Sequence, residues 1–204
     1  DAVLPCHVIQ PHQTHSVKLA CIDDPGIARE QLEGVDALVT NLRGVAIGVR
    51  TADCIPVLLY DPVRGAIGAA HSGWRGTVNM IAKKTVVEMV RLFGCSPSDI
   101  RAVIGPGIGF DSFQVGEEVA LVFKESGFPV DRIWNFRGAR AENSMEGGHH
   151  IDLKECVRIS LVDCGVPADN IQVSDIDTYI DDRFYSARRE GPQTGRNINA
   201  VKMV

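Results

Sequence analysis

The sequence predicts an α+β fold in a single domain that spans residues 1–204. Before residue 70 the chain consists of short apolar runs bounded by turn residues, which is typical of β-strands. From residue 77 onward the apolar positions change to a helical period, and helices then alternate with strands. A hydrophobic content of 45% is enough to fill one substantial core or two fused halves.

The strands of the first third follow from these apolar runs and from the turn residues between them. Pro56 has no backbone donor, so its strand should begin near this residue or lie at a sheet edge. The run from 65 to 70 is rich in small residues and should be buried. The predicted strands are 8–9, 17–22, 37–40, 45–49, 55–60 and 65–70, and at most one helical turn is expected over 26–33.

A helix is predicted from Thr77 to Phe93, because the apolar residues recur at helical spacing and Gly94 follows as a stop signal. Thr77 is expected to cap this helix. Two further helices are predicted, over 116–126 and from the cap Asp152 to residue 164. The remaining strands are predicted over 102–104, 132–136 and 171–173, and the polar segment 137–150, which includes His149 and His150, is expected to be an irregular, mobile loop.

A weak internal repeat accompanies two of these helices. Each helix is followed by a glycine, a proline and an aspartate, and then by an isoleucine that opens a strand: Gly94 to Ile100, and Gly165 to Ile171. A repeat of this kind indicates a duplicated α+β unit. The alternative is that glycine and proline are simply common where a helix joins a strand.

The net charge of −5 excludes the electrostatic pattern of a nucleic-acid-binding protein or of a protein that binds anionic membranes. The apolar stretch from 45 to 60 contains Arg50 and Asp53, so no transmembrane helix is predicted. The six cysteines form no Cys-x-x-Cys pair, which in a chain of this length favours reduced thiols and a cytoplasmic location.

Three side chains at the ends of predicted strands are candidate metal ligands. His71 ends one apolar run, Cys54 lies in the polar break before another, and His15 lies in a short segment near the start. Two imidazoles and a thiolate can form a tetrahedral metal site with its fourth position open, as in catalytic sites. The simpler interpretations are a buried structural thiol, a core histidine with satisfied hydrogen bonds and a solvated loop histidine.

Candidate anion sites lie in two segments. After His71, two glycines flank Arg75, and the expected helix start would direct free N–H groups outward, so Arg75 and Gly76 are candidates for binding phosphate or a carboxylate. Near the end of the chain three arginines are clustered and predict a second anion-binding wall: Arg188, Arg189 and Arg196. A solvated basic stretch is the alternative for that segment.

Taken together, these stretches resemble the YfiH-type laccase-domain family, which includes purine nucleoside phosphorylases and peptidoglycan-editing factors and was formerly named for multicopper polyphenol oxidases. The resemblance spans nearly the whole chain in the family's order. Its most specific motifs are Thr51-Ala52-Asp53-Cys54 and His71-Ser72-Gly73-Trp74-Arg75-Gly76. The other matching pieces are Gln13-Thr14-His15, Ile104-Gly105-Pro106-Gly107-Ile108, Asp152-Leu153, Phe184-Tyr185-Ser186-Ala187-Arg188-Arg189 and Thr194-Gly195-Arg196.

The resemblance implies an α/β/β/α layered sandwich with mixed sheets and internal duplication. It also implies a metal centre on His15, Cys54 and His71, usually taken as zinc, and copper can occupy such a site. The implied activity is phosphorolysis of adenosine, inosine and methylthioadenosine to a free base and a sugar 1-phosphate, with adenosine deamination in the same pocket. Some members are linked to editing of cell-wall precursors.

The sequence departs from the family pattern in three places. Only fourteen residues precede His15, so the family's N-terminal segment is expected to be missing from the domain. The family's Gly-Pro-Cys is Gly105-Pro106-Gly107 here, and its C-terminal Cys-Thr pair is Asp177-Thr178. None of these changes removes a candidate metal ligand.

The leading hypothesis is therefore a zinc-dependent purine nucleoside phosphorylase and adenosine deaminase, with nucleoside and phosphate as its partners and a monomer or small homo-oligomer as its assembly. Cys54, His71, Asp53 and Arg75 are the candidate catalytic residues, with Asp53 as proton donor to the departing base. The candidate phosphate contacts are Arg75, Gly76, Arg188 and Arg189.

Besides a non-catalytic metal-binding module, two alternatives remain. The first is a metal-free hydrolase for cell-wall precursors, with Cys54 as nucleophile and His71 or His15 as base. The second is a copper-dependent polyphenol oxidase, which is disfavoured because the chain has six histidines and no His-x-His pair.

Overall fold

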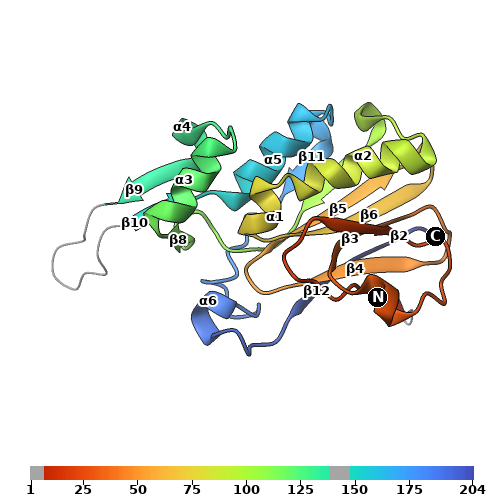
Figure 1. Ribbon diagram of the computed structural model, residues 1–204, viewed down its shortest axis with the longest axis horizontal. Coiled ribbons are helices and arrows are strands. Elements are labelled where there is room, and N and C mark those ends of the chain that lie inside the picture. Colours follow the sequence, from red (N-terminus) through yellow and green to blue (C-terminus); the bar gives the residue numbers. More distant parts are fainter. Residues whose placement is uncertain (1–6, 138–147) are drawn as a thin grey trace.

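The structure is a computed structural model that describes residues 7–137 and 148–204. Its main body consists of helices, a six-stranded sheet and a three-stranded sheet, packed as layers in that order (Figure 1). The described residues thus form the helix, sheet and sheet layers of the predicted sandwich, and the mixed α/β class is confirmed. No helix in the described part of the chain is both long and apolar enough to span a bilayer.

The six-stranded sheet has antiparallel pairing in its centre and parallel strands at both edges. Its central β6 is buried throughout and rich in small residues, which lets helix α2 (Ile81–Phe93) approach closely: a Cβ atom at Gly68 would lie 3.2 Å from the Met89 sulfur of α2. In spatial order its strands are β11 (Ile171–Val173), β7 (Arg101–Ile104), β5 (Ile55–Asp61), β6 (Ala66–Ser72), β3 (Val35–Thr40) and β2 (Lys18–Cys21).

Two smaller sheets complete the architecture. One consists of β1 (Val8–Ile9), β4 (Ala46–Thr51) and β12 (Asn197–Lys202), and it packs its apolar side against the six-stranded sheet. The other consists of β8 (Gln114–Val115), β10 (Gly148–Ile151) and β9 (Trp134–Arg137), beside α3 (Glu117–Glu125) and α4 (Val130–Ile133). The short helical turns are η1 (Arg29–Leu32), η2 (Pro97–Asp99) and η3 (Ala168–Asn170), and α6 (Ala187–Glu190) lies near the chain end.

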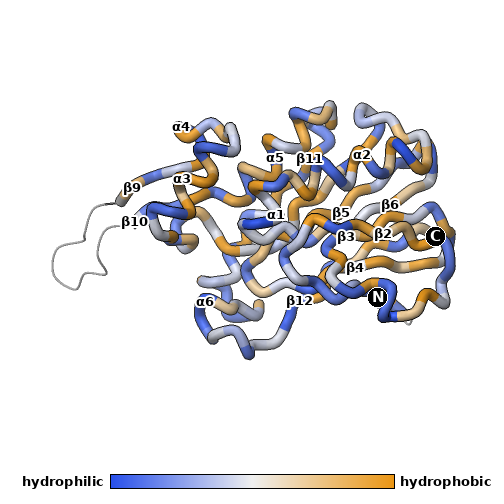
Figure 2. Tube along the Cα trace, viewed as in Figure 1, coloured by the Kyte–Doolittle hydropathy of each residue, from blue (hydrophilic) through white to orange (hydrophobic). Residues whose placement is uncertain are grey.

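Two apolar cores hold these layers together. The larger lies between the six-stranded sheet and the helices, and the smaller lies between the two sheets of the main body. Figure 2 shows the corresponding hydrophobic strands at the centre of the molecule, with hydrophilic stretches along the outer helices and loops. Burial of these apolar side chains is the main driving force for this arrangement.

The helix predicted from Thr77 to Phe93 is two helices, α1 (Trp74–Val78) and α2 (Ile81–Phe93). Met80 between them has a left-handed backbone with φ of 60°, which interrupts the helical hydrogen bonding. Thr77 is not the cap, because it lies inside α1 and its hydroxyl donates to the Gly73 carbonyl at 2.9 Å. Apolar residues continue across the break, so the sequence period does not reveal it.

The predicted mobile loop is wrong for its last residues, because His149 and His150 lie in strand β10. His149 accepts a hydrogen bond from the Trp134 indole at 2.9 Å, and His150 is buried. Both residues pair with strands that are distant in sequence, which no local pattern shows. Residues 138–147 of the same predicted loop lie outside the described residues.

The weak repeat corresponds to two neighbouring units of the same design. In each unit a helix, α2 or α5 (Leu153–Asp163), ends before a glycine with positive φ, and a short turn leads into a strand. The two strands pair in parallel, with Ile171 opposite Ala102. Asp152 caps α5 as predicted, since its side chain accepts from the Glu155 amide at 2.9 Å.

Candidate metal centre

Three ligand candidates meet at one end of the central hairpin. Cys54 directly precedes β5, and His71 lies near the end of β6. Because Ile55 pairs with Ser72 in antiparallel fashion, Cys54 and His71 lie at the same end of this hairpin. His15 comes from the loop before β2, and its Nε2 lies 3.6 Å from the Cys54 Sγ. The ligand atoms of all three side chains lie within 4.8 Å of one another. The structure therefore brings together the three residues that the sequence proposed.

Asp36 of β3 holds both histidines in place. Its buried carboxylate accepts a hydrogen bond from the His71 Nδ1 at 2.7 Å, which leaves the Nε2 nitrogen of that ring available as a ligand. The same carboxylate accepts the backbone N–H groups of Thr14, His15 and Ser16 at 2.8–3.1 Å. These bonds fix the loop that carries His15, whose φ of 62° is left-handed. One buried carboxylate thus orients two of the three candidate ligands.

The electrostatics of the three side chains favour a thiolate. Burial alone would raise the pKa of Cys54, but hydrogen bonds to His15 and His71 outweigh it and lower this pKa to about 6. Burial would likewise lower the pKa of His71, but the hydrogen bonds to Asp36 and Cys54 raise it to about 9. A metal needs a thiolate and a neutral imidazole, so binding here would release the His71 proton. Two imidazoles and a thiolate are ligands that suit zinc and copper, and the residues present fit such an ion.

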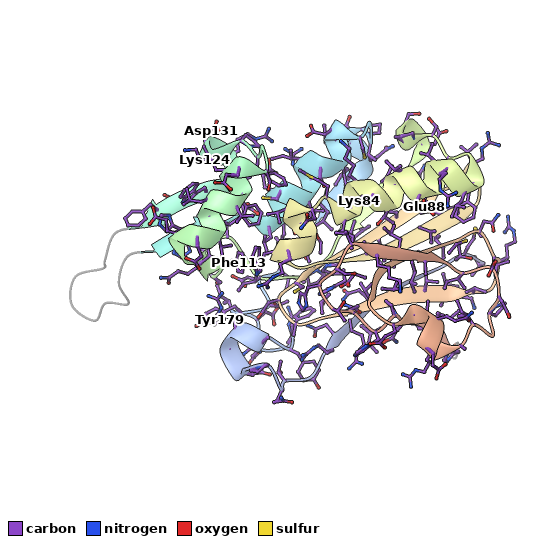
Figure 3. The ribbon with its side chains drawn as sticks, viewed as in Figure 1. Lys84, Glu88, Phe113, Lys124, Asp131 and Tyr179 are labelled. Carbon is purple, nitrogen blue, oxygen red and sulfur yellow. The ribbon has the colours of Figure 1, made fainter. Side chains whose placement is uncertain are left out.

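The candidate centre opens into a cavity of about 690 Å³. Its apolar wall includes Ile108 and Phe113, and the side chain of Phe113 lies where the segment before α3 approaches the C-terminal part of the chain (Figure 3). Its polar wall includes arginines and, among the residues that the structure describes, the single carboxylate Asp53. The lining residues are Pro11, His12, Gln13, His15, Arg50, Ala52, Asp53, Cys54, His71, Ile108, Phe113, Ala187, Arg188, Pro192, Gln193, Thr194 and Arg196.

Asp53 borders the cavity, and both of its carboxylate oxygens accept hydrogen bonds. One accepts from the Thr178 hydroxyl at 2.8 Å, and the other accepts from the backbone N–H of Arg188 at 2.6 Å. The φ of Asp53 is 81°, a left-handed conformation that these two bonds help to hold. The carboxylate therefore ties the Cys54 loop to α6.

Arg75 and Gly76 do not line this cavity. The Arg75 guanidinium lies over the Trp74 ring, 4.3 Å from its centroid, and Gly76 is buried inside α1. Helix α1 has only five residues, so the predicted long helix with free N-terminal amides beside Arg75 is not present. A phosphate contact by Arg75 or Gly76 stays a prediction.

The C-terminal arginines divide into two kinds. Arg188 and Arg196 line the cavity. Arg189 instead donates to the backbone carbonyls of Thr178, Tyr179 and Phe184 at 2.6–2.9 Å and pairs with Glu190 at 2.7 Å. These bonds give Arg189 a structural role in holding the 178–184 segment, and a phosphate contact by this residue stays a prediction.

Sequence reasoning missed Asp36, Arg50 and the cavity position of Phe113. Asp36 had a detectable signal, because it is a charged residue inside a strand that is otherwise apolar up to Thr40. A buried charge in such a strand needs a partner, and a histidine at the end of another strand is a natural one. Arg50 had no such signal, since it directly follows the predicted strand 45–49, as many exposed arginines do.

Comparisons with known proteins agree with this fold. The sequence profile described as multi-copper polyphenol oxidoreductase laccase matches residues 2–204. The chain is 42% identical over 205 residues to a purine nucleoside phosphorylase of Bacteroides thetaiotaomicron, with 97% of this chain and 74% of that protein covered. It is 42% identical over 201 residues to "Adenosine deaminase RL5" of an unknown prokaryotic organism, with 95% and 74% covered. The crystal structure of the Bacillus licheniformis hypothetical protein YfiH superposes with a TM-score of 0.86 at 31% identity, covering 97% of this chain and 74% of that one.

Proposed function

The chain belongs to the multi-copper polyphenol oxidoreductase laccase family, and from this premise we propose that it is a metal-dependent purine nucleoside phosphorylase that also deaminates adenosine. One observation carries the proposal: the cluster of His15, Cys54 and His71 opens into a cavity of about 690 Å³ in a chain this similar to a purine nucleoside phosphorylase. A cavity of that size is large enough for a nucleoside with a phosphate.

The proposed reaction joins phosphate to the sugar of adenosine, inosine or methylthioadenosine. A phosphate oxygen forms the new bond to the anomeric carbon while the bond from that carbon to the purine nitrogen breaks. The departing base takes the proton that the phosphate brings, so the products are a free purine and a sugar 1-phosphate. Deamination of adenosine instead consumes water and releases ammonia and inosine.

The protein's own residues position these reactants. Ile108 and Phe113 provide an apolar wall for the flat purine, and they exclude water from one side of the cavity. Asp36 keeps the His71 ring in one tautomer and orientation. Zinc held by His15, Cys54 and His71 would supply Lewis-acid chemistry and activation of water.

Asp53 acts in this scheme as a positioning residue for α6. Both of its oxygens accept hydrogen bonds, one from the Thr178 hydroxyl and one from the Arg188 backbone N–H, and these bonds fix the carboxylate beside α6. The proton-donor role expected from the sequence stays a prediction.

The test combines metal analysis and product analysis on one preparation without a histidine tag. We expect about one zinc per chain, and a purine base plus a sugar phosphate from inosine or adenosine with phosphate. Cys54→Ala should lose both the metal and the activity. Cys21→Ala, a change at a half-buried cysteine outside the cavity, is the matched control and should keep both. Absence of any purine base, sugar phosphate or deaminated product would refute the proposal.

A metal-free thiol hydrolase is the second candidate, because the pKa of Cys54 is lowered to about 6 and an imidazole lies 3.6 Å from its sulfur. The same preparation separates the two functions. A stoichiometric metal that disappears in Cys54→Ala supports the phosphorylase, whereas a metal-free active protein that is inactivated by alkylation of Cys54 supports the hydrolase.

A further inference from the structure

We propose that Arg50, Arg188 and Arg196 form the subsite for the phosphate co-substrate; this inference rests on the proposed phosphorolysis. All three arginines line the cavity that contains the candidate metal centre. They come from distant parts of the chain: Arg50 from β4, Arg188 from α6, and Arg196 from the segment before β12. The ligand they suit is a small tetrahedral oxyanion, because a guanidinium fork matches phosphate geometry.

The charge balance of the cavity supports an anionic ligand. The whole chain carries a net charge of −5, yet the cavity wall has three arginines and a single carboxylate, Asp53. The donors to that carboxylate, the Thr178 hydroxyl and the Arg188 backbone amide, are neutral, so Asp53 offsets at most one of the three arginine charges. A cleft with an excess of charge of one sign concentrates ligands of the opposite sign.

Arg50 has the most available guanidinium of the three. Its backbone N–H and carbonyl both bond to the Gln13 side chain at 2.8 Å, which fixes the end of β4. Its guanidinium makes no hydrogen bond or ion pair with the residues that the structure describes. All five N–H donors of this side chain are therefore free to bind a ligand.

The other two arginines keep their charge uncompensated while their orientation is fixed. Arg188 donates one bond to the Gln114 carbonyl at 2.9 Å, and its guanidinium lies 5.7 Å from the Phe113 ring centroid. Arg196 donates to the carbonyls of Pro192 at 3.0 Å and Gly195 at 2.9 Å. Carbonyl oxygens are neutral, so both guanidinium groups retain a full positive charge toward the cavity, and they are preorganised for an oxyanion.

The test measures KM for phosphate and KM for inosine separately in Arg50→Gln and Arg196→Gln. We expect KM for phosphate to rise about 10- to 100-fold in each variant, as for loss of a charge-assisted hydrogen bond, with a much smaller change in KM for inosine. Arg50→Lys keeps the charge and should recover part of the loss. The matched control is Arg91→Gln, because Arg91 is exposed and pairs with Glu88 at 2.6 Å. Glu88 lies on α2, away from the cavity (Figure 3).

Calorimetric titration of the metal-loaded protein with inorganic phosphate provides a readout that is independent of turnover. Phosphate binding to the wild type that is weakened in Arg50→Gln supports the subsite, even if the wild type proves inactive as a phosphorylase. An active wild type whose Arg50 and Arg196 variants keep the normal KM for phosphate overturns the subsite and leaves the proposed function intact. A rise in that KM in Arg75→Gln alone overturns it as well. Thermal melting of each variant identifies any loss of folding.

Discussion

Gly73→Ala tests whether the three ligand candidates are packed as the structure shows. Gly73 precedes α1 with φ of −69° and ψ of 170°, a conformation that alanine adopts without strain. A Cβ atom at this position would lie 2.7 Å from the His15 Cδ2 and 3.0 Å from the Cys54 Sγ. The added methyl group therefore collides with two ligand side chains, and its backbone cost is negligible.

The magnitude follows from the cost of overpacking. One extra methyl group in a closely packed site costs about 1–3 kcal/mol. His15 is exposed, so its ring can move away and relieve the collision. The collision then returns only when metal binding requires His15 at the ion. The overpacking cost therefore appears as a metal affinity lowered about 5- to 150-fold.

The assay is competition between the untagged protein and a chelator of known zinc affinity, followed by phosphorolysis of inosine at saturating metal. The control is Gly26→Ala, whose new Cβ would meet only the side chain of Asp24. We expect Gly26→Ala to bind zinc like the wild type. If Gly73→Ala keeps the wild-type zinc affinity and melting temperature, then His15 and Cys54 do not pack against Gly73 when they bind the ion, and the predicted collision is refuted.

Three further changes have outcomes fixed by single contacts. Asp36→Asn replaces the carboxylate that accepts from the His71 ring and should lower metal affinity about 10- to 100-fold in the same chelator competition. Glu155→Gln should destabilise the protein in urea by about 0.5–1 kcal/mol at pH 7, and the difference should vanish as the pH falls below the folded-state pKa of Glu155. Hydrogen bonds from Arg158 and Arg132 hold that pKa below its usual value, so their stabilisation is present above the unfolded-state pKa of about 4.3 and is lost in acid. Phe123→Ala removes a fully buried ring from the larger core and should cost about 3–5 kcal/mol in urea unfolding, with zinc affinity unchanged.

The sequence was sufficient to predict that the candidate ligands lie together where their geometry is local. Cys54 and His71 flank one hairpin, and its register follows from two apolar runs and the turn between them. Asp36 was missed because its contact with His71 crosses from β3 to β6, and strand order is not visible in one sequence. The same limit explains β12, whose alternating polar residues become a strand only by pairing with β4.

The arginines show a second limit, which concerns neighbouring residues. Arg188 and Arg189 are adjacent and chemically identical, yet one lines the cavity and the other is enclosed by backbone carbonyls. Their difference arises from the turn of α6, which directs successive side chains about 100° apart. A cluster of arginines therefore predicts an anion-binding wall, but only coordinates assign its members.

One carboxylate joins the two halves of the proposed site. Asp53 is adjacent to Cys54 in the chain and accepts the backbone N–H of Arg188 at 2.6 Å. The loop that carries the candidate metal ligand Cys54 and the helix that carries the proposed phosphate contact Arg188 are thus fixed to each other through one side chain, and the Thr178 hydroxyl holds its other oxygen. Removal of Asp53 would disturb both halves together, so a lost activity in such a variant says nothing about proton donation. The informative variants for phosphate are the arginines, because Arg50 can be changed without touching this link.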